Sequence, residues 1–153
     1  MKYYSTRNKE VKVSFREAVL NGLAPDGGLY LPEYWPIFSP HELGHMMEKP
    51  LHVVAFRVLQ SFTTRDIPSP ELNKLLQEVL NFPLKLVEVE EGIFSLELFH
   101  GPTAAFKDFG ARFLARCMAW FTRNENKSTK VLVATSGDTG SAVANGFRDM
   151  PGI

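Results

Sequence analysis

The hydrophobic pattern of the chain changes at Pro83, and this change constrains the possible folds more than any other feature. Before Pro83, apolar residues recur at the helical spacing i, i+3, i+4, i+7 and i+8, most clearly after Ser69. After Pro83, residues 84–89 and 93–98 alternate with the period of two that is typical of strands. The sequence therefore predicts a mostly helical first lobe followed by an α/β part.

Local signals mark the helix ends of the first lobe. Ser14 opens a capping box with the glutamate three residues later, and Ser39 is followed by Pro40, which is well tolerated in a first helical turn. Gly22 is placed to end the first helix. We predict four helices here, beginning near Ser14, Ser39, Leu51 and Ser69.

The second part of the chain alternates strands and helices. After the strand over residues 93–98, we predict a helix capped by Asp108, a buried strand over Lys130–Thr135 and a helix over Ser141–Phe147. The buried stripe of the first of these helices is expected to contain Phe109, Phe113, Cys117 and Phe121. This order of elements is typical of a parallel α/β sheet.

A boundary near Glu90–Gly92 divides the chain into a helical domain (1–92) and the start of an α/β domain (93–153). A parallel sheet that is covered on both faces needs several strands, and this chain supplies two or three. We therefore expect the chain to be truncated.

Composition excludes several classes of function. The 153 residues include seventeen basic and seventeen acidic ones, so the formal net charge is zero. The chain therefore lacks the excess of basic residues with which proteins bind nucleic acids or membrane surfaces. No apolar run is long enough to span a membrane, and the first residues do not form an apolar signal core. The single cysteine, Cys117, fits a reducing compartment. We expect a cytoplasmic protein with no nucleic-acid or membrane partner.

The segment His41–His45 matches the zinc-protease pattern H-E-x-x-H. Glu42, however, stands three residues after Ser39 and has an ordinary role in a capping box. A helical wheel places Leu43, Met46 and Met47 on the buried face and both histidines on the opposite, solvated face. We therefore predict no metal site and no zinc catalysis.

Lys107 is the leading candidate for chemistry. It lies between Phe106 and Asp108 at an expected helix start. Partial desolvation near a helix N-terminus favours the neutral amine, which is the form that attacks an aldehyde cofactor. An ordinary surface lysine before a helix is the alternative. A serine–lysine hydrolase motif fails, because Ala104 occupies the serine position.

The second candidate is the loop Ser136–Gly140, between the expected strand and helix. Its glycines allow a close backbone approach, and its amides and hydroxyls suit a carboxylate or a phosphate. The carboxylate of Asp138 opposes simple anion binding. The loop matches neither a Walker nor a Rossmann pattern, and a plain turn with a cap is the alternative.

Two segments resemble threonine synthases. Residues 96–113, LELFHGPTAAFKDFGARF, are similar to the cofactor-lysine segment of that family, and residues 134–140, ATSGDTG, are similar to its second motif. The first lobe also agrees, in its opening residues 1–4 and in residues 27–32. The likeness covers essentially the whole chain.

The resemblance implies a pyridoxal-phosphate enzyme of the tryptophan-synthase-β-like fold, which converts O-phosphohomoserine and water to threonine and phosphate. Lys107 would form the Schiff base with the cofactor. Asp138, where related enzymes often carry asparagine, would contact the cofactor. The substrate would be held by Ser136, Gly137, Thr139 and Gly140. His100 and Thr103 would only shape the lysine segment.

Two alternatives stay open at this point. A phospho-lyase relative would release a 2-oxo acid from the same substrate. A non-catalytic remnant would keep the lysine without completing a site, and would associate through exposed apolar sheet surface.

The isolated chain is predicted to have little or no synthase activity. In the resembled family, the loop that binds the cofactor phosphate and the partner of the pyridine nitrogen lie beyond the segment covered here. The check is an assay of threonine and phosphate release from O-phosphohomoserine by the purified chain. Measurable threonine formation would contradict the prediction.

Overall fold

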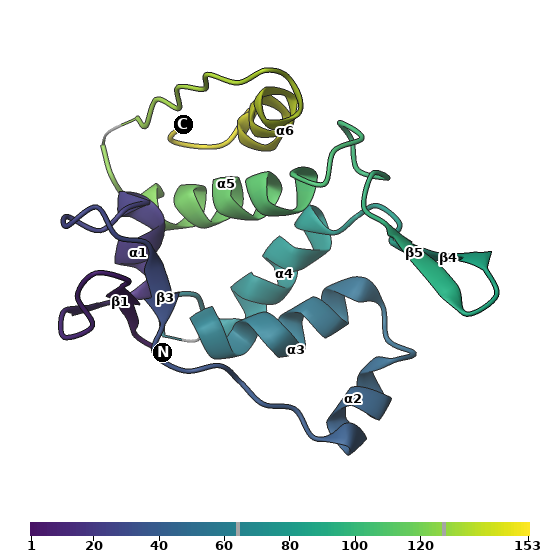
Figure 1. Cartoon of the computed structure of the whole chain (residues 1–153). Coiled ribbons are helices and arrows are strands. Elements are labelled where there is room, and N and C mark those ends of the chain that lie inside the picture. Colours follow the sequence, from purple (N-terminus) through teal and green to yellow (C-terminus); the bar gives the residue numbers. More distant parts are fainter. Residues whose placement is uncertain (64, 127) are drawn as a thin grey trace. The chain divides into compact units, whose positions relative to one another are not determined.

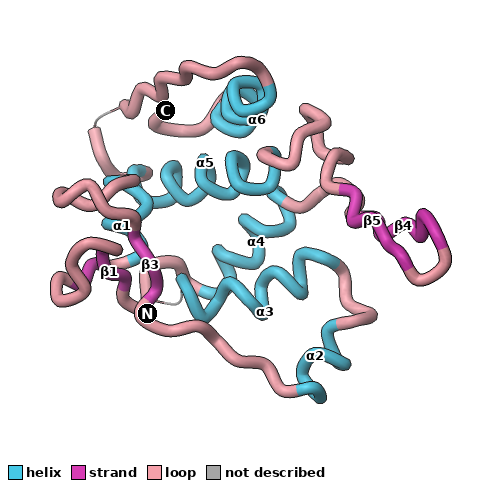
Figure 2. Tube along the Cα trace, viewed as in Figure 1, coloured by secondary structure: helices cyan, strands magenta, loops and turns pink. Residues whose placement is uncertain are grey.

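The computed structural model describes residues 1–63, 65–126 and 128–153, which group into two compact units, Met1–Gln77 and Glu78–Ile153 (Figure 1). Helices and short strands make up both units (Figure 2). Every strand pair among the described residues is antiparallel. The fold is therefore α/β with two small sheets, and the parallel sheet expected from the element order is not formed within these residues.

The sheet of the first unit is built around its N-terminal strand. Its strands are β1 (Tyr3–Ser5) in the centre, with β2 (Lys12–Val13) and β3 (Tyr30–Pro32) on either side. Tyr3 is buried, and its hydroxyl donates a hydrogen bond to the backbone oxygen of Phe62 at 3.0 Å. Its ring also lies 5.8 Å from that of Phe15. Tyr3 thus joins the sheet to two of the surrounding helices.

The four predicted helices of the first part are confirmed. They are α1 (Phe15–Asn21), α2 (Pro40–Met46), α3 (Leu51–Thr63) and α4 (Ser69–Val79), of which the last ends two residues into the second unit. Both capping boxes form, at Ser14 and at Ser39, so side chains satisfy two backbone amides at the start of α1 and two at the start of α2. The predicted stripe of α4 is buried at Leu72, Leu75, Leu76 and Val79.

The second unit contains a hairpin and two longer helices. Its elements are β4 (Lys85–Glu90), β5 (Ile93–Glu97), α5 (Asp108–Thr122) and α6 (Asp138–Phe147). The hairpin confirms both predicted strands, but most of its residues are exposed on both faces. None of the helices in the described part of the chain has both the length and the apolar character needed to cross a membrane.

The strand predicted over Lys130–Thr135 is wrong for this structure. The segment has no strand assignment, and Leu132 at its centre is 93% exposed. An extended segment becomes a strand only when a neighbour accepts and donates its backbone hydrogen bonds. No described strand pairs with residues 130–135, since β5 is paired with β4. The apolar pattern alone therefore did not determine the state of this segment.

The face predicted to be buried on α2 is also wrong in part. Leu43 is 50% exposed and Met47 is 84% exposed, while Met46 is half-buried. This seven-residue helix buries none of its residues, so its apolar side chains have no core to fill. The capping role predicted for Glu42 is confirmed, because its carboxylate accepts from the backbone amide of Ser39 at 2.9 Å.

The buried side of α5 differs from the predicted stripe. Cys117 and Phe121 are buried as expected, but Phe109 and Phe113 are half-buried. Asp108 does not cap the helix: it is the first helical residue, and Lys107 occupies the cap position, where its side chain makes no capping hydrogen bond within the described part of the chain. The reason is that the Asp108 carboxylate is bonded to the preceding turn instead.

The Cys117 thiol provides a test of this packing. Burial raises its pKa from 9.0 to about 12, and the thiolate is the form that attacks disulfide reagents. We expect an aromatic disulfide reagent at pH 8 to label the native chain far more slowly than the guanidinium-unfolded chain. Because the pKa of the buried thiol is raised, its contribution to the free energy of unfolding is fully present below pH 9.0. This contribution is lost as the pH rises towards 12. Equal labelling rates in the folded and unfolded chains would contradict the burial.

Candidate active site

Lys107 lies on the rim of a hollow formed by α5 and α6. The residue occupies the cap position of α5, and its side chain is exposed. The hollow has a volume of about 300 Å³. It is lined by Phe106, Lys107, Gly110, Ala111, Leu114, Thr139 and Val143. An amine and a hydroxyl are thus the polar side-chain groups of a mainly apolar depression.

The α5 side of this hollow follows a helical spacing. Lys107, Gly110, Ala111 and Leu114 stand at i, i+3, i+4 and i+7, which places them on one face. Thr139 and Val143, four residues apart, form the α6 side. Sequence reasoning missed the apolar members of this group. The signal was present in the i, i+3, i+4, i+7 series that starts at Lys107 itself.

Small residues allow α5 and α6 to pack closely side by side, as Figure 1 also shows. Ala115 and Ala142 are completely buried. A Cβ atom placed on Gly146 would lie 3.0 Å from the backbone carbon of Ala111, tighter than nearly all real contacts. The two backbones therefore approach each other at Gly146, and this approach fixes the width of the hollow.

The predicted loop Ser136–Gly140 contributes one residue to the hollow. α6 begins at Asp138, three residues earlier than predicted, so Thr139 lies in its first turn and faces Lys107 across the hollow. The other four residues of the loop do not line the hollow, and Ser136, Gly137 and Asp138 are exposed. The structure brings Lys107 and Thr139 together and leaves the remaining predicted site residues outside.

The segment before Lys107 is held by side-chain hydrogen bonds. Nε2 of His100 lies 2.6 Å from Oε2 of Glu97, at the end of β5. Thr103 donates two hydrogen bonds to the carboxylate of Asp108, from its amide at 2.9 Å and from its hydroxyl at 2.7 Å. The shaping role expected for His100 and Thr103 therefore has a physical basis in these bonds.

Arg112 was not singled out by sequence reasoning, yet it is one of the few buried charged residues. Its guanidinium donates to the backbone oxygens of Glu78 at 2.6 Å and Val79 at 3.1 Å, and to Oδ1 of Asn81 at 2.8 Å. It also lies over the ring of Phe82. Burial lowers the pKa of Arg112 from its usual value, and these acceptors stabilise the charge. Arg112 thereby fixes the middle of α5 to the last residues of α4 and to the segment directly after it.

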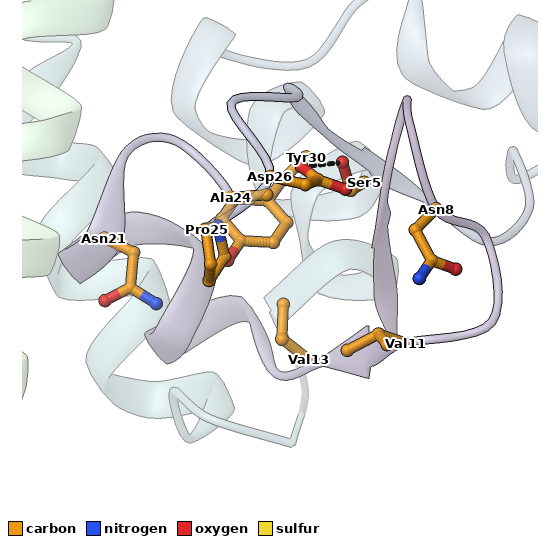
Figure 3. A pocket seen from close by; sticks show the side chains of 9 residues that line it. All are labelled: Ser5, Asn8, Val11, Val13, Asn21, Ala24, Pro25, Asp26 and Tyr30. Atoms are coloured by element: carbon orange, nitrogen blue, oxygen red, sulfur yellow. Dashed lines mark hydrogen bonds between the residues drawn. The ribbon is translucent and has the colours of Figure 1, made fainter.

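A second hollow of about 300 Å³ lies in the first unit (Figure 3). A hydrogen bond of 2.7 Å from the Ser5 hydroxyl to the Asp26 carboxylate forms part of its wall. This bond is the largest cause of the lowered pKa of Asp26. The hydroxyl of Tyr30 is buried there and has no hydrogen-bond partner among the described residues. None of the residues predicted for the active site lines this hollow.

The Lys107 amine is exposed beside this hollow, so the partial desolvation expected from the sequence is not seen in the structure. Comparisons with known proteins identify the family. The family model described as threonine synthase N terminus matches residues 2–80. A threonine synthase of Haemophilus influenzae is 40% identical over 153 residues, which are all of this chain and 35% of the relative.

Solved structures give the same result. The structure of PLP-bound threonine synthase from Brucella melitensis has a TM-score of 0.94 and 38% identity, and covers 99% of this chain and 34% of that one. Threonine synthase from Escherichia coli gives a TM-score of 0.90 at 38% identity, covering 99% of this chain and 35% of that one. The chain belongs to the threonine synthase family, and it spans about a third of the length of these relatives.

The close approach at Gly146 predicts opposite effects for two glycine substitutions. Gly146→Ala is expected to destabilise the chain by about 1–3 kcal/mol, because the methyl group must displace the backbone of α5. Gly110→Ala, where a Cβ meets nothing within 4 Å, is expected to stabilise the chain by up to about 1 kcal/mol. Urea unfolding of both variants measures the difference. A Gly146→Ala variant as stable as Gly110→Ala would rule out the close packing.

Proposed function

We propose that this chain carries the reactive lysine of a threonine synthase, a pyridoxal-phosphate lyase that converts O-phosphohomoserine and water to L-threonine and phosphate. The observation that carries the proposal is the presence of Lys107 and Thr139 on one hollow, in a chain of the threonine synthase family. Residues 1–92 would form the N-terminal domain, and residues 93–153 would begin the cofactor domain of the tryptophan-synthase-β-like fold. The enzyme would act in the cytoplasm.

The residues of the hollow fit pyridoxal phosphate. Its volume lies at the lower end of the range of small-molecule sites, and its apolar lining suits an aromatic ring. The amine of Lys107 is the group that an aldehyde cofactor requires. When bound, the cofactor would supply the aldehyde with which this amine reacts and the ring that withdraws electrons from the substrate.

Lys107 is proposed to act twice. Its exposed amine stands on a flexible four-carbon stem, so it would hold the cofactor and would be free to move when it is not attached. The free amine would be the group that moves protons at the α and β carbons of the substrate. Phe106 and Leu114, both of which are exposed, line the hollow beside it and give it apolar walls.

The start of α6 is proposed to hold the substrate carboxylate. Thr139 offers its hydroxyl inside the hollow, and the first amides of a helix favour an anion. Ser136, Gly137 and Gly140 would contribute from the same turn. Asp138 would contact the cofactor. Its carboxylate also stabilises the start of α6, because a negative charge complements the positive end of the helix dipole.

Reduction with borohydride in the presence of pyridoxal phosphate tests the role of Lys107. Peptide mapping of the chain is expected to find the reduced cofactor on Lys107. The Lys107→Arg variant keeps the charge but cannot form the link, so the selective label should disappear. Lys85→Arg, which changes an exposed lysine on β4, should leave it unchanged. Label spread evenly over the exposed lysines of the wild-type chain would contradict the proposal.

A further inference from the structure

Asp108 is a buried carboxylate to which the proposed reaction gives no role. The residue is 0% exposed, although it directly follows the exposed Lys107. A buried carboxylate is costly unless its oxygens accept hydrogen bonds. Both oxygens accept from a single residue: the Thr103 amide donates to Oδ2 at 2.9 Å, and the Thr103 hydroxyl donates to Oδ1 at 2.7 Å.

These bonds hold a tight turn at residues 101–104 against the start of α5. The turn closes with the amide of Ala104 donating to the backbone oxygen of Gly101 at 3.1 Å. Ala104 has a φ of 54°, a left-handed conformation that alanine seldom adopts and that persists only where its surroundings enforce it. A Cβ atom on Gly101 would lie 2.5 Å from Oδ2 of Asp108, so the turn rests directly on the carboxylate.

The backbone of Lys107 lies between this turn and the helix. The amide of Asp108 donates to the backbone oxygen of Ala105 at 3.0 Å, and the backbone oxygen of Lys107 accepts from the amide of Ala111 at 2.9 Å. Asp108 shares the buried face of α5 with Arg112 and Ala115. Lys107 is exposed on the rim of the hollow. Fixing the Asp108 side chain therefore fixes the backbone from which the Lys107 side chain projects.

Arg112 holds the same face of α5 one turn further on. Its guanidinium is bound by the backbone oxygens of Glu78 and Val79. α5 is thus held at two points on its buried side, near its start by Asp108 and in its middle by Arg112. Rotation of the helix, which would carry Lys107 away from Thr139, would break bonds at both points.

We propose that Asp108 is a positioning residue for Lys107, because its carboxylate clamps the turn at Thr103 and thereby sets the orientation of the lysine towards the hollow. The inference rests on the proposed function of Lys107, and it adds a residue that acts through the backbone without touching the substrate. Thr103 is the partner through which the clamp acts.

The test compares Asp108→Asn, Thr103→Val and Thr103→Ser with the wild-type chain. Thr103→Val keeps the shape of the side chain and removes the hydroxyl donor, whereas Thr103→Ser keeps the donor. Asp149→Asn is the matched control, since it removes an exposed carboxylate at a position with φ of 57°, which asparagine tolerates. Thermal unfolding establishes that each variant is folded under the conditions used.

Amide hydrogen exchange of peptides covering residues 101–108 is the first measurement. Thr103→Val and Asp108→Asn are expected to exchange about tenfold faster than wild type, the change that loss of one charge-assisted hydrogen bond produces. Thr103→Ser and Asp149→Asn should exchange as wild type does. This measurement needs no cofactor, so it judges the clamp independently of the proposed function.

Borohydride trapping with pyridoxal phosphate is the second measurement. The share of label on Lys107 is expected to fall in Thr103→Val and Asp108→Asn and to be restored in Thr103→Ser, with labelling of other lysines unchanged. Selective wild-type labelling of Lys107 that Thr103→Val leaves intact would overturn this inference alone. Wild-type label spread over several lysines would overturn the proposed function, and this inference with it.

Discussion

The bond between Asp108 and Thr103 is the interaction on which the rest of the site depends. It satisfies a buried carboxylate, fixes the turn before α5 and determines where Lys107 leaves the helix. Arg112 holds the same helix from its middle, and Gly146 brings α6 against it. The hollow beside Lys107 exists because these contacts fix the position of α5 relative to the turn and to α6.

The sequence predicted most of the local structure, because local signals determine it. The capping boxes at Ser14 and Ser39 and the stripe of α4 depend on residues within one or two helical turns, and all three were found as predicted. The strand over Lys130–Thr135 depends on a neighbouring strand, and no described strand pairs with it. The buried face of α2 was mispredicted for a related reason, since Leu43 and Met47 have no core beside them.

The candidate site was predictable only in part. Lys107 was singled out by its position at an expected helix start and then by a long motif that resembles a known family, and Thr139 was singled out by a glycine-rich loop. The apolar lining of the hollow depends on how closely α5 and α6 pack, and this distance cannot be predicted from the sequence pattern of either helix alone. Asp108 was misread as a helix cap because the capping pattern is local. Its actual partner, Thr103, reaches it through a left-handed turn at Ala104 that no periodicity indicates.

The proposed role of Lys107 in threonine synthesis can be measured in a chimaera. In it, residues 1–153 of this chain replace the matching third of Escherichia coli threonine synthase, to which the chain is 38% identical. We expect the folded, cofactor-loaded chimaera to release threonine and phosphate from O-phosphohomoserine, and its Lys107→Ala variant to release neither. A folded and loaded chimaera that forms only a 2-oxo acid, or that keeps its activity without Lys107, would show that this chain does not supply the reactive lysine of a threonine synthase.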